Sequence, residues 1–190
     1  MKYRLPRCFA AIVLAGLATT SVGAEETNLS ALIYSPWTKF CLNETCFVGS
    51  DGRSVPDCEP VVSAVLIARL GNSKATLRVT LPAGVNVKHG VRIVIDRGEP
   101  IERSFVGCLA NGCRADYDGG AELVDQFKHG LYLRLEAVDK ANLPINITVP
   151  LTGFDDAYDG APQETKVFET TVDKLQAQLD ERKTRCGTAK

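Results

Sequence analysis

The chain has 190 residues, 45% of them hydrophobic, and a formal net charge of −1 at pH 7. This length suits one domain with a sizeable core. Acidic residues are dispersed and no basic patch with interleaved aromatic residues occurs, which argues against a nucleic acid partner.

The N-terminus has the three parts of a secretory signal peptide, which we predict for Met1–Ala24. The apolar run Cys8–Ala18 follows three basic residues, and Val22–Ala24 supplies the small residues of a cleavage site. The run is too short to span a bilayer. Cleavage would leave 19 basic and 23 acidic residues, a net charge of −4. No second long apolar run follows, so we expect an exported protein without a transmembrane segment.

Six cysteines remain after cleavage, and an even number in an exported chain predicts structural disulfides. Spacing favours two matched local pairs, Cys41–Cys46 and Cys108–Cys113, each pinning a hairpin or tight loop. Cys58 and Cys186 then form the third pair. Neither local pair has the Cys-x-x-Cys spacing of thiol oxidoreductases, and zinc sites favour shorter spacings. We therefore predict neither a redox centre nor a metal site at these residues.

Alternating apolar residues and turn signals predict a strand-rich chain. Ala75–Leu81 is a clear example, because Leu77, Val79 and Leu81 share one face, and Gly71–Lys74 before it suits a hairpin. In chain order, we expect strands at Ala64–Leu70, Ala75–Leu81, Val91–Asp96, Ile101–Cys108, Gly112–Tyr117, Leu131–Val138 and Ile145–Leu151. In the strand Leu131–Val138, the expected inner face is Leu131, Leu133, Leu135 and Ala137.

Regularly spaced strands joined by turns predict an antiparallel β-sandwich, stapled by disulfides, with a C-terminal amphipathic helix. That helix is Glu164–Arg185, whose apolar residues follow helical spacing. Asp155–Asp159 suits a short helical turn, and Glu122–Lys128 is ambiguous. The predicted organisation is a signal peptide at 1–24, a sandwich domain at 25–160 and a helical extension at 161–190.

An ordered set of short motifs runs from about Ser35 to Tyr158. Their order is Trp37 before Cys41 and Cys46, Leu81-Pro82-Ala83-Gly84-Val85, Gly90-Val91-x-x-x-Ile95-Asp96, Cys108-x-x-x-Gly112-Cys113-x-Ala115 and Leu151-x-Gly153-Phe154-x-x-Ala157. The set resembles the invasion-associated locus B family of Gram-negative exported proteins. The resemblance implies a β-sandwich held by short-range disulfides, in the periplasm or at the cell surface. Founding members of that family are associated with bacterial entry into host red blood cells.

This chain differs from the family pattern by the Cys58 and Cys186 pair and by the extension Glu164–Lys190. The motif residues suggest structural roles. We expect Trp37 to pack on a disulfide in the core and Phe154 to cap the core after the last strand. We expect the Asp96 carboxylate to accept hydrogen bonds from the turn amides that follow it.

No phosphate-binding loop, nucleophile elbow or zinc-protease motif occurs. Asp116–Asp118 and Asp155–Asp156 could bind calcium but are more typical of solvated loops, and His89 and His129 stand alone. We thus predict no catalytic, cofactor-binding or metal-binding residue.

The expected function is that of an exported, non-enzymatic interaction protein of the cell envelope, with support of host-cell invasion as the more specific hypothesis. The alternatives are a periplasmic stress or envelope-maintenance factor and a thiol-redox protein. The expected partner is a cell-envelope or host-cell protein, or a second copy of the chain. The expected location is the periplasm, the cell surface or the medium of a Gram-negative bacterium.

Overall fold

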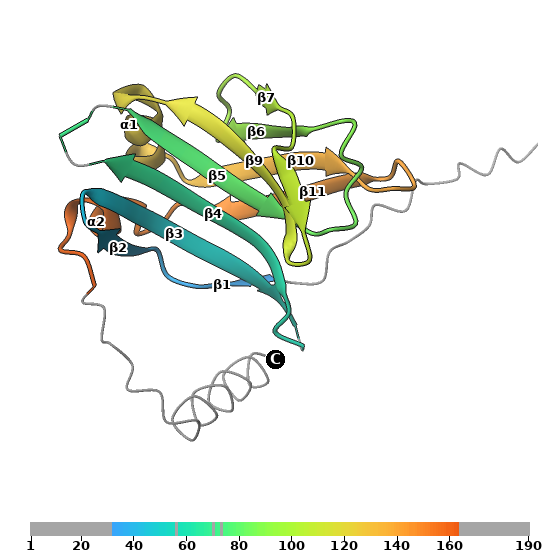
Figure 1. Cartoon of the computed structure of the whole chain (residues 1–190), viewed down its shortest axis with the longest axis horizontal. Helices are drawn as coiled ribbons and strands as arrows, with labels where there is room; N and C mark the ends of the chain where they lie inside the picture. The colour runs from blue at the N-terminus through green and yellow to red at the C-terminus, as the bar shows by residue number, and fades with distance from the viewer. Residues whose placement is uncertain (1–31, 56, 70, 73, 164–190) are drawn as a thin grey trace, which may run out of the picture.

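The computed structural model describes residues 32–55, 57–69, 71–72 and 74–163. The predicted signal peptide and the predicted helix Glu164–Arg185 lie outside these residues. Within them, two antiparallel sheets pack face to face, with two short helices at one end (Figure 1). The predicted antiparallel β-sandwich is therefore confirmed.

The larger sheet has seven strands in the order β1-β3-β4-β5-β9-β8, with β2 also paired to β3. The smaller sheet has the order β11-β10-β6-β7. The larger sheet consists of β1 (Leu32–Tyr34), β2 (Thr38–Leu42), β3 (Thr45–Ser54), β4 (Pro60–Arg69), β5 (Ala75–Leu81), β8 (Gly107–Leu109) and β9 (Gly112–Gly119). The smaller sheet consists of β6 (Val91–Ile95), β7 (Ile101–Arg103), β10 (Tyr132–Val138) and β11 (Pro144–Pro150).

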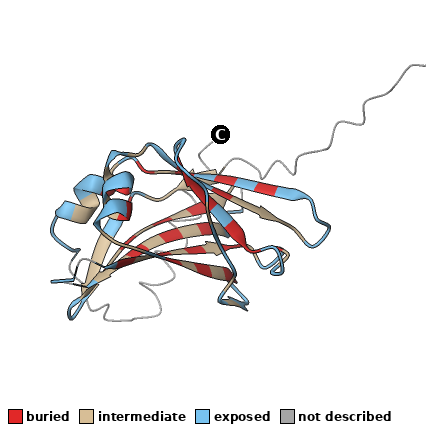
Figure 2. Cartoon of the chain, turned by 90° about the horizontal axis from the view of Figure 1, so that it is seen from above, coloured by how far each residue is buried: buried red, intermediate tan, exposed pale blue. Residues whose placement is uncertain are grey.

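The core lies between the two sheets, where alternate residues of each strand point inward. Along β5, Leu77, Val79 and Leu81 are fully buried, while the residues between them are half-buried. Figure 2 shows this alternation as red and tan bands along the larger sheet. The inward residues predicted for β5 are therefore correct, because strict alternation is the sequence signature of a strand with one buried face.

Strand β3 has two partners on one side, an arrangement that the sequence analysis did not predict. β1 pairs with its C-terminal part and β2 with its N-terminal part. Between them the chain leaves the ladder at Ser35–Trp37. The Ser35 hydroxyl donates to Asp51 Oδ1 at 2.8 Å and accepts the Asp51 N–H at 3.0 Å. This break turns Trp37 into the core.

The predicted strand Ile101–Cys108 is wrong as a single element. The chain crosses from one layer to the other within it, so β7 belongs to the smaller sheet and β8 to the larger one. Phe105 lies in the crossing and packs against the core. Because Phe105 is apolar, the sequence pattern did not distinguish this connection from a continuous strand.

Leu131 is a second correction, because it is 62% exposed and not part of the inner face. The strand begins one residue later, at Tyr132, and Leu133 and Leu135 are buried as expected. Asp96 explains this start: its carboxylate accepts the N–H groups of Leu131 and Tyr132 at 2.9–3.2 Å. The acceptor role predicted for Asp96 exists, but its donors are Leu131 and Tyr132, at the start of β10, instead of the amides of the following turn.

The helices are α1 (Ala121–His129) and α2 (Phe154–Asp159). The ambiguous segment Glu122–Lys128 is thus helical, with Leu123 and Phe127 buried on one face. Phe154 begins α2 and is fully buried, as expected for a residue that closes the core after β11. None of the helices in the described ranges is long and apolar enough to span a membrane.

Two aromatic side chains join the layers through hydrogen bonds. Trp37 Nε1 donates to the Pro150 carbonyl at 2.9 Å, and Tyr117 Oη donates to the Val91 carbonyl at 2.7 Å. Trp37 is buried in the core as expected, and its ring packs edge-on against Phe127 and Phe154, while its packing on a disulfide stays a prediction. The two bonds hold the sheets together on opposite sides of the core.

Candidate functional site: a groove at the helical end

The predicted local disulfides are both present in the structure. Cys41–Cys46 closes the β2–β3 hairpin and Cys108–Cys113 closes the β8–β9 hairpin, with Cα–Cα distances of 4.0 and 3.9 Å. In each hairpin the two cysteines are direct cross-strand partners. Each bridge therefore fixes the register of a hairpin at an edge of the larger sheet.

Cys58, just after β3, is also disulfide-bonded. Its predicted partner, Cys186, lies outside the described residues, so this pairing stays a prediction.

Tyr158, on α2, is the centre of a polar and aromatic cluster at the helical end of the sandwich. Its ring packs on Phe154, with 5.6 Å between centroids. The Lys128 ammonium lies 4.8 Å from the centroid of the Tyr158 ring and the Lys39 ammonium lies 5.9 Å from it. Such distances place both cations within range of the electron-rich ring.

Other bonds hold these two lysines in place. Lys39 Nζ donates to the carbonyls of Tyr158 at 2.7 Å and Gly160 at 3.1 Å. Lys128 Nζ forms an ion pair with Asp159 at 2.7 Å. The cluster therefore fastens α2 to β2 on one side and to α1 on the other, and it orients the Tyr158 ring.

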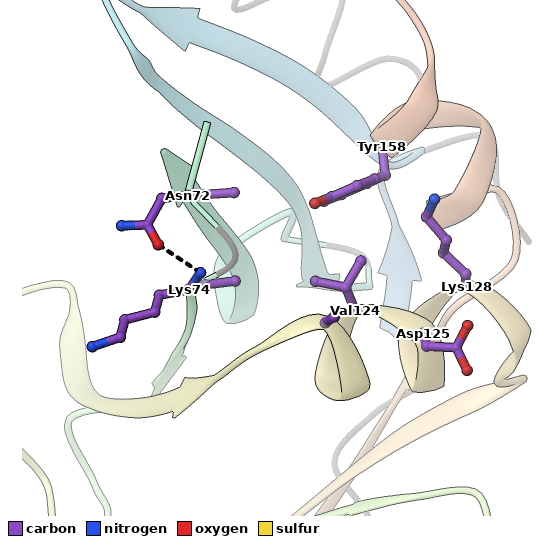
Figure 3. Close-up of a pocket in the computed structure, with 9 residues that line it drawn as sticks. Asn72, Lys74, Val124, Asp125, Lys128 and Tyr158 are labelled. Atoms are coloured by element: carbon purple, nitrogen blue, oxygen red, sulfur yellow. Dashed lines mark hydrogen bonds between the residues drawn. The ribbon is translucent and has the colours of Figure 1, made fainter. Parts of the chain in front are cut away.

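A groove runs beside this ring. One hollow, of about 310 Å³, lies between the β4–β5 turn and the helices, and a second, of about 200 Å³, continues it toward β2. The two hollows share Ala68, Asn72 and Tyr158. Figure 3 shows the first hollow, with Tyr158 and Lys128 on one side and Asn72 and Lys74 on the other, where the Lys74 side chain extends outward from the rim. Its floor is apolar, formed by Ala68, Ala75 and Val124.

The rim of the groove is cationic. Four basic side chains line it against one carboxylate, Asp125. Among the described residues, the exposed Arg69 and Lys74 side chains have no hydrogen-bond or ion-pair partner, whereas Lys39 and Lys128 are engaged around Tyr158. On a chain with net charge −1, this is a local region of positive charge. It favours a ligand that combines an apolar group with a carboxylate or another anion.

The outer face of the smaller sheet carries another hollow, of about 390 Å³, with different chemistry. There Glu136 pairs with both Arg92 and Arg134. Partial burial acts to raise the pKa of Glu136, but hydrogen bonds from the two arginines outweigh it and hold the pKa below its usual value. Both arginines are engaged by Glu136, and Glu102 adds a second carboxylate to the lining, so this hollow is a weaker candidate for ligand binding.

The acidic residues considered for calcium do not line the groove, although Asp155 and Asp156 lie on α2 beside it. Asp116 accepts two hydrogen bonds from the Arg78 guanidinium, which lower the pKa of its carboxyl group. Asp118 accepts a hydrogen bond from the Thr76 hydroxyl. In the described part of the chain, no three His, Cys, Asp or Glu residues are grouped closely enough to hold a metal ion.

The fold and groove define the class: a two-layer antiparallel β-sandwich with disulfide-closed edge hairpins. Residues 37–162 match the family model described as Invasion associated locus B (IalB) protein, and the chain therefore belongs to this family. The crystal structure of invasion associated protein B from Bartonella henselae is similar, with a TM-score of 0.57 and 21% sequence identity. That similarity covers 80% of this chain and 99% of the other, and at this identity it shows the fold alone. A comparison with curated proteins finds no match.

Sequence reasoning found the disulfides but not the groove. Its lining comes from β2, β4, β5, α1 and α2, which are far apart in the sequence. A sequence signal for part of the groove was the four-residue spacing between Phe154 of the last motif and Tyr158 just after it, which places both rings on one side of a helix.

Proposed function

We propose that the chain is an exported, non-enzymatic interaction protein of the Gram-negative cell envelope, and that it binds a segment of a partner protein in the groove. Membership of the family supports the envelope assignment. The observation that carries the binding proposal is the combination of an apolar floor with a cationic rim, two of whose basic side chains, Arg69 and Lys74, have no partner among the described residues.

The chemistry of the groove specifies the kind of segment. Arg69 and Lys74 are exposed and offer unneutralised charge, while the Tyr158 ring and Val124 offer apolar surface between them. A peptide that carries a carboxylate next to an aromatic or aliphatic side chain satisfies both parts at once. Exposed ion pairs are screened by salt, so we expect binding to weaken as ionic strength rises.

In-cell crosslinking tests this proposal. The mature protein is crosslinked in the bacterium that produces it and recovered by affinity purification, and the attached proteins are identified by mass spectrometry. The double variant Arg69→Glu with Lys74→Glu reverses the rim charge and should lose a partner recovered with the wild type. The matched variant Lys88→Glu with Arg97→Glu makes the same charge change at exposed positions outside the groove and should retain that partner.

An identical set of attached proteins in both variants and the wild type would show that the groove is not the binding site. Recovery of the protein alone, in good yield and correctly folded, would refute the interaction role itself.

We further propose that this interaction supports host-cell invasion, as the name of the family suggests. Such a role needs exposure at the cell surface or release into the medium. Protease treatment of intact cells should therefore degrade the protein, or the medium should contain it. Complete protection with none in the medium would refute the invasion role and leave the binding proposal for a periplasmic partner intact.

A further inference from the structure

The outer face of the larger sheet carries an apolar patch that the core does not use. Phe40, Phe47 and Ile67 are aligned across β2, β3 and β4, and Val65 lies two residues further along β4. All four are half-buried and none belongs to the core cluster. Leu42, 60% exposed, extends this outer patch at the end of β2. A solvated sheet face normally presents polar residues, so such a patch indicates a contact surface.

The described chain ends at the border of the outer patch. The N–H of Gln163 donates to the Lys39 carbonyl at 2.8 Å, and Lys39 immediately precedes Phe40. The remaining sequence, 164–190, is amphipathic: Phe168, Val172, Leu175 and Leu179 follow the i, i+4, i+7, i+11 spacing of one helix face.

The other end of that segment has a point of attachment. Cys58 is disulfide-bonded, and four of the other cysteines are used in the two local bridges. Of the two that remain, Cys8 falls in the predicted signal peptide, which leaves Cys186. The charges on the two sides are opposite and favour this pairing. Two exposed acidic residues, Asp57 and Glu59, flank Cys58. Three basic residues come just before Cys186: Arg182, Lys183 and Arg185.

The segment has the length to join these two points across the outer patch. The two attachment points lie beside residues of the same strand, β3. Lys39 is paired with Val48, and the Cys58 N–H donates to the carbonyl of Ser54, six residues further along the strand. Six residues of strand correspond to about 20 Å. Residues 164–185 as a helix extend about 33 Å, so a helix of about 15 residues covers the distance and leaves residues for both connections.

We propose that the C-terminal segment of this chain docks as an amphipathic helix on the outer patch, fastened by a Cys58–Cys186 disulfide. The helix lies along β3 and β4 and forms a third layer on the larger sheet. Phe168 and Val172 then cover the stacked rings of Phe40 and Phe47, which lie 6.3 Å apart. This proposal is independent of the function proposed for the groove.

A photo-crosslinking experiment on the mature, oxidised protein tests the docking. The photoreactive amino acid p-benzoylphenylalanine replaces Phe47, and the product is digested and analysed by mass spectrometry. We expect crosslinks to peptides within 164–185 of the same chain. The same probe at Leu109, an exposed position at the opposite edge of the sheet, should give none.

Two further substitutions distinguish docking from chance proximity. Leu175→Glu places a charge on the apolar face and should lower the docking equilibrium constant about tenfold or more. Gln176→Glu makes the same charge on the neighbouring polar position and should leave the crosslink yield unchanged. If the probe at position 47 prevents folding, as judged by circular dichroism, Ile67 is the second probe position.

Three outcomes would overturn the proposal. One is crosslinks that join two chains, which would assign the outer patch to a second copy. Another is an intact, folded protein in which neither probe position reaches residues 164–185. The third is a non-reducing peptide map in which Cys58 is joined to a cysteine other than Cys186.

Discussion

The hydroxyl group of Tyr117 offers a direct measurement of how strongly the two sheets are joined. Tyr117 is 1% exposed on β9, and its Oη donates to the carbonyl of Val91, which is 1% exposed on β6. Tyr117→Phe keeps the ring and removes only the donor. Leaving a buried carbonyl without its hydrogen-bond donor lowers the free energy of unfolding by about 1–2 kcal/mol. In a fold of this size we expect the Tm to fall by about 3–5 °C for each kcal/mol lost.

The same substitution has a signature in the pH dependence of stability. Burial raises the pKa of Tyr117 above its ordinary value of 10.0, so the folded state keeps the proton where the unfolded state releases it. Its contribution to stability is therefore present below pH about 10 and is lost as the pH rises through the folded-state pKa. Phenylalanine has no proton to release. The free energy of unfolding of the variant should thus decline less steeply above pH 10 than that of the wild type.

Denaturant unfolding at pH 7, 9 and 10.5 measures both effects, with fluorescence of Trp37, the single tryptophan, as the probe. Tyr132→Phe is the control, because Tyr132 is 53% exposed and its hydroxyl has no hydrogen-bond partner among the described residues. We expect the control within about 0.5 kcal/mol of the wild type. A Tyr117→Phe variant with wild-type stability and a wild-type alkaline slope would refute the reasoning.

Three further predictions concern single positions. Gly112→Ala should destabilise the fold by about 2–3 kcal/mol in denaturant unfolding, because φ is +132° and a Cβ would overlap a backbone carbonyl of β5, whereas Gly107→Ala, with open space, should be neutral. Asp96→Ala should lower the free energy of unfolding by about 1 kcal/mol in the same assay, because it removes the carboxylate that accepts the Leu131 and Tyr132 amides. Asp96→Asn should lower it less, because asparagine keeps one acceptor oxygen and tolerates the φ of +49°. Hydrogen bonds from Arg78 lower the pKa of Asp116, so the pair contributes to the free energy of unfolding above pH about 4. That contribution is lost as acid protonates the carboxylate. Acid titration of Arg78→Gln should therefore show a smaller loss of stability than that of the wild type, and equal losses would contradict the assignment.

Much of the sandwich could be predicted from local sequence patterns. β5 was located residue for residue, and β6, β9 and β11 to within two residues, because each has a clear apolar alternation ended by a turn. The strands that were missed are β1, β2 and β3. Ser35 lies in the break between β1 and β2, and Gly49 and Gly52 lie within β3, where they interrupt an apolar pattern. Gly52 is nonetheless required there, because a Cβ would overlap the ring of Tyr34 from the adjacent strand. A pairing partner imposes that requirement, and no local pattern reveals it.

The groove could not be predicted for a related reason. Tyr158, Lys128 and Lys39 come from three elements that meet only when the helices fold over the end of the sandwich. Each is an ordinary surface residue in the sequence. The charge on the rim likewise depends on which cations find partners, and only the packed structure shows that Lys128 is neutralised while Lys74 is not.

The sequence by itself determined the local features of this protein: the alternation of its inner strands, the two disulfide-closed hairpins and the ordered motifs of its family. Each strand, hairpin and single motif involves residues within about ten positions of one another, where spacing alone sets the geometry. Only the tertiary structure decided where the chain changes layers, which aromatic groups join the sheets and which side chains share the groove. Those features depend on contacts between distant segments, because burial and charge pairing arise when the two sheets close on one another.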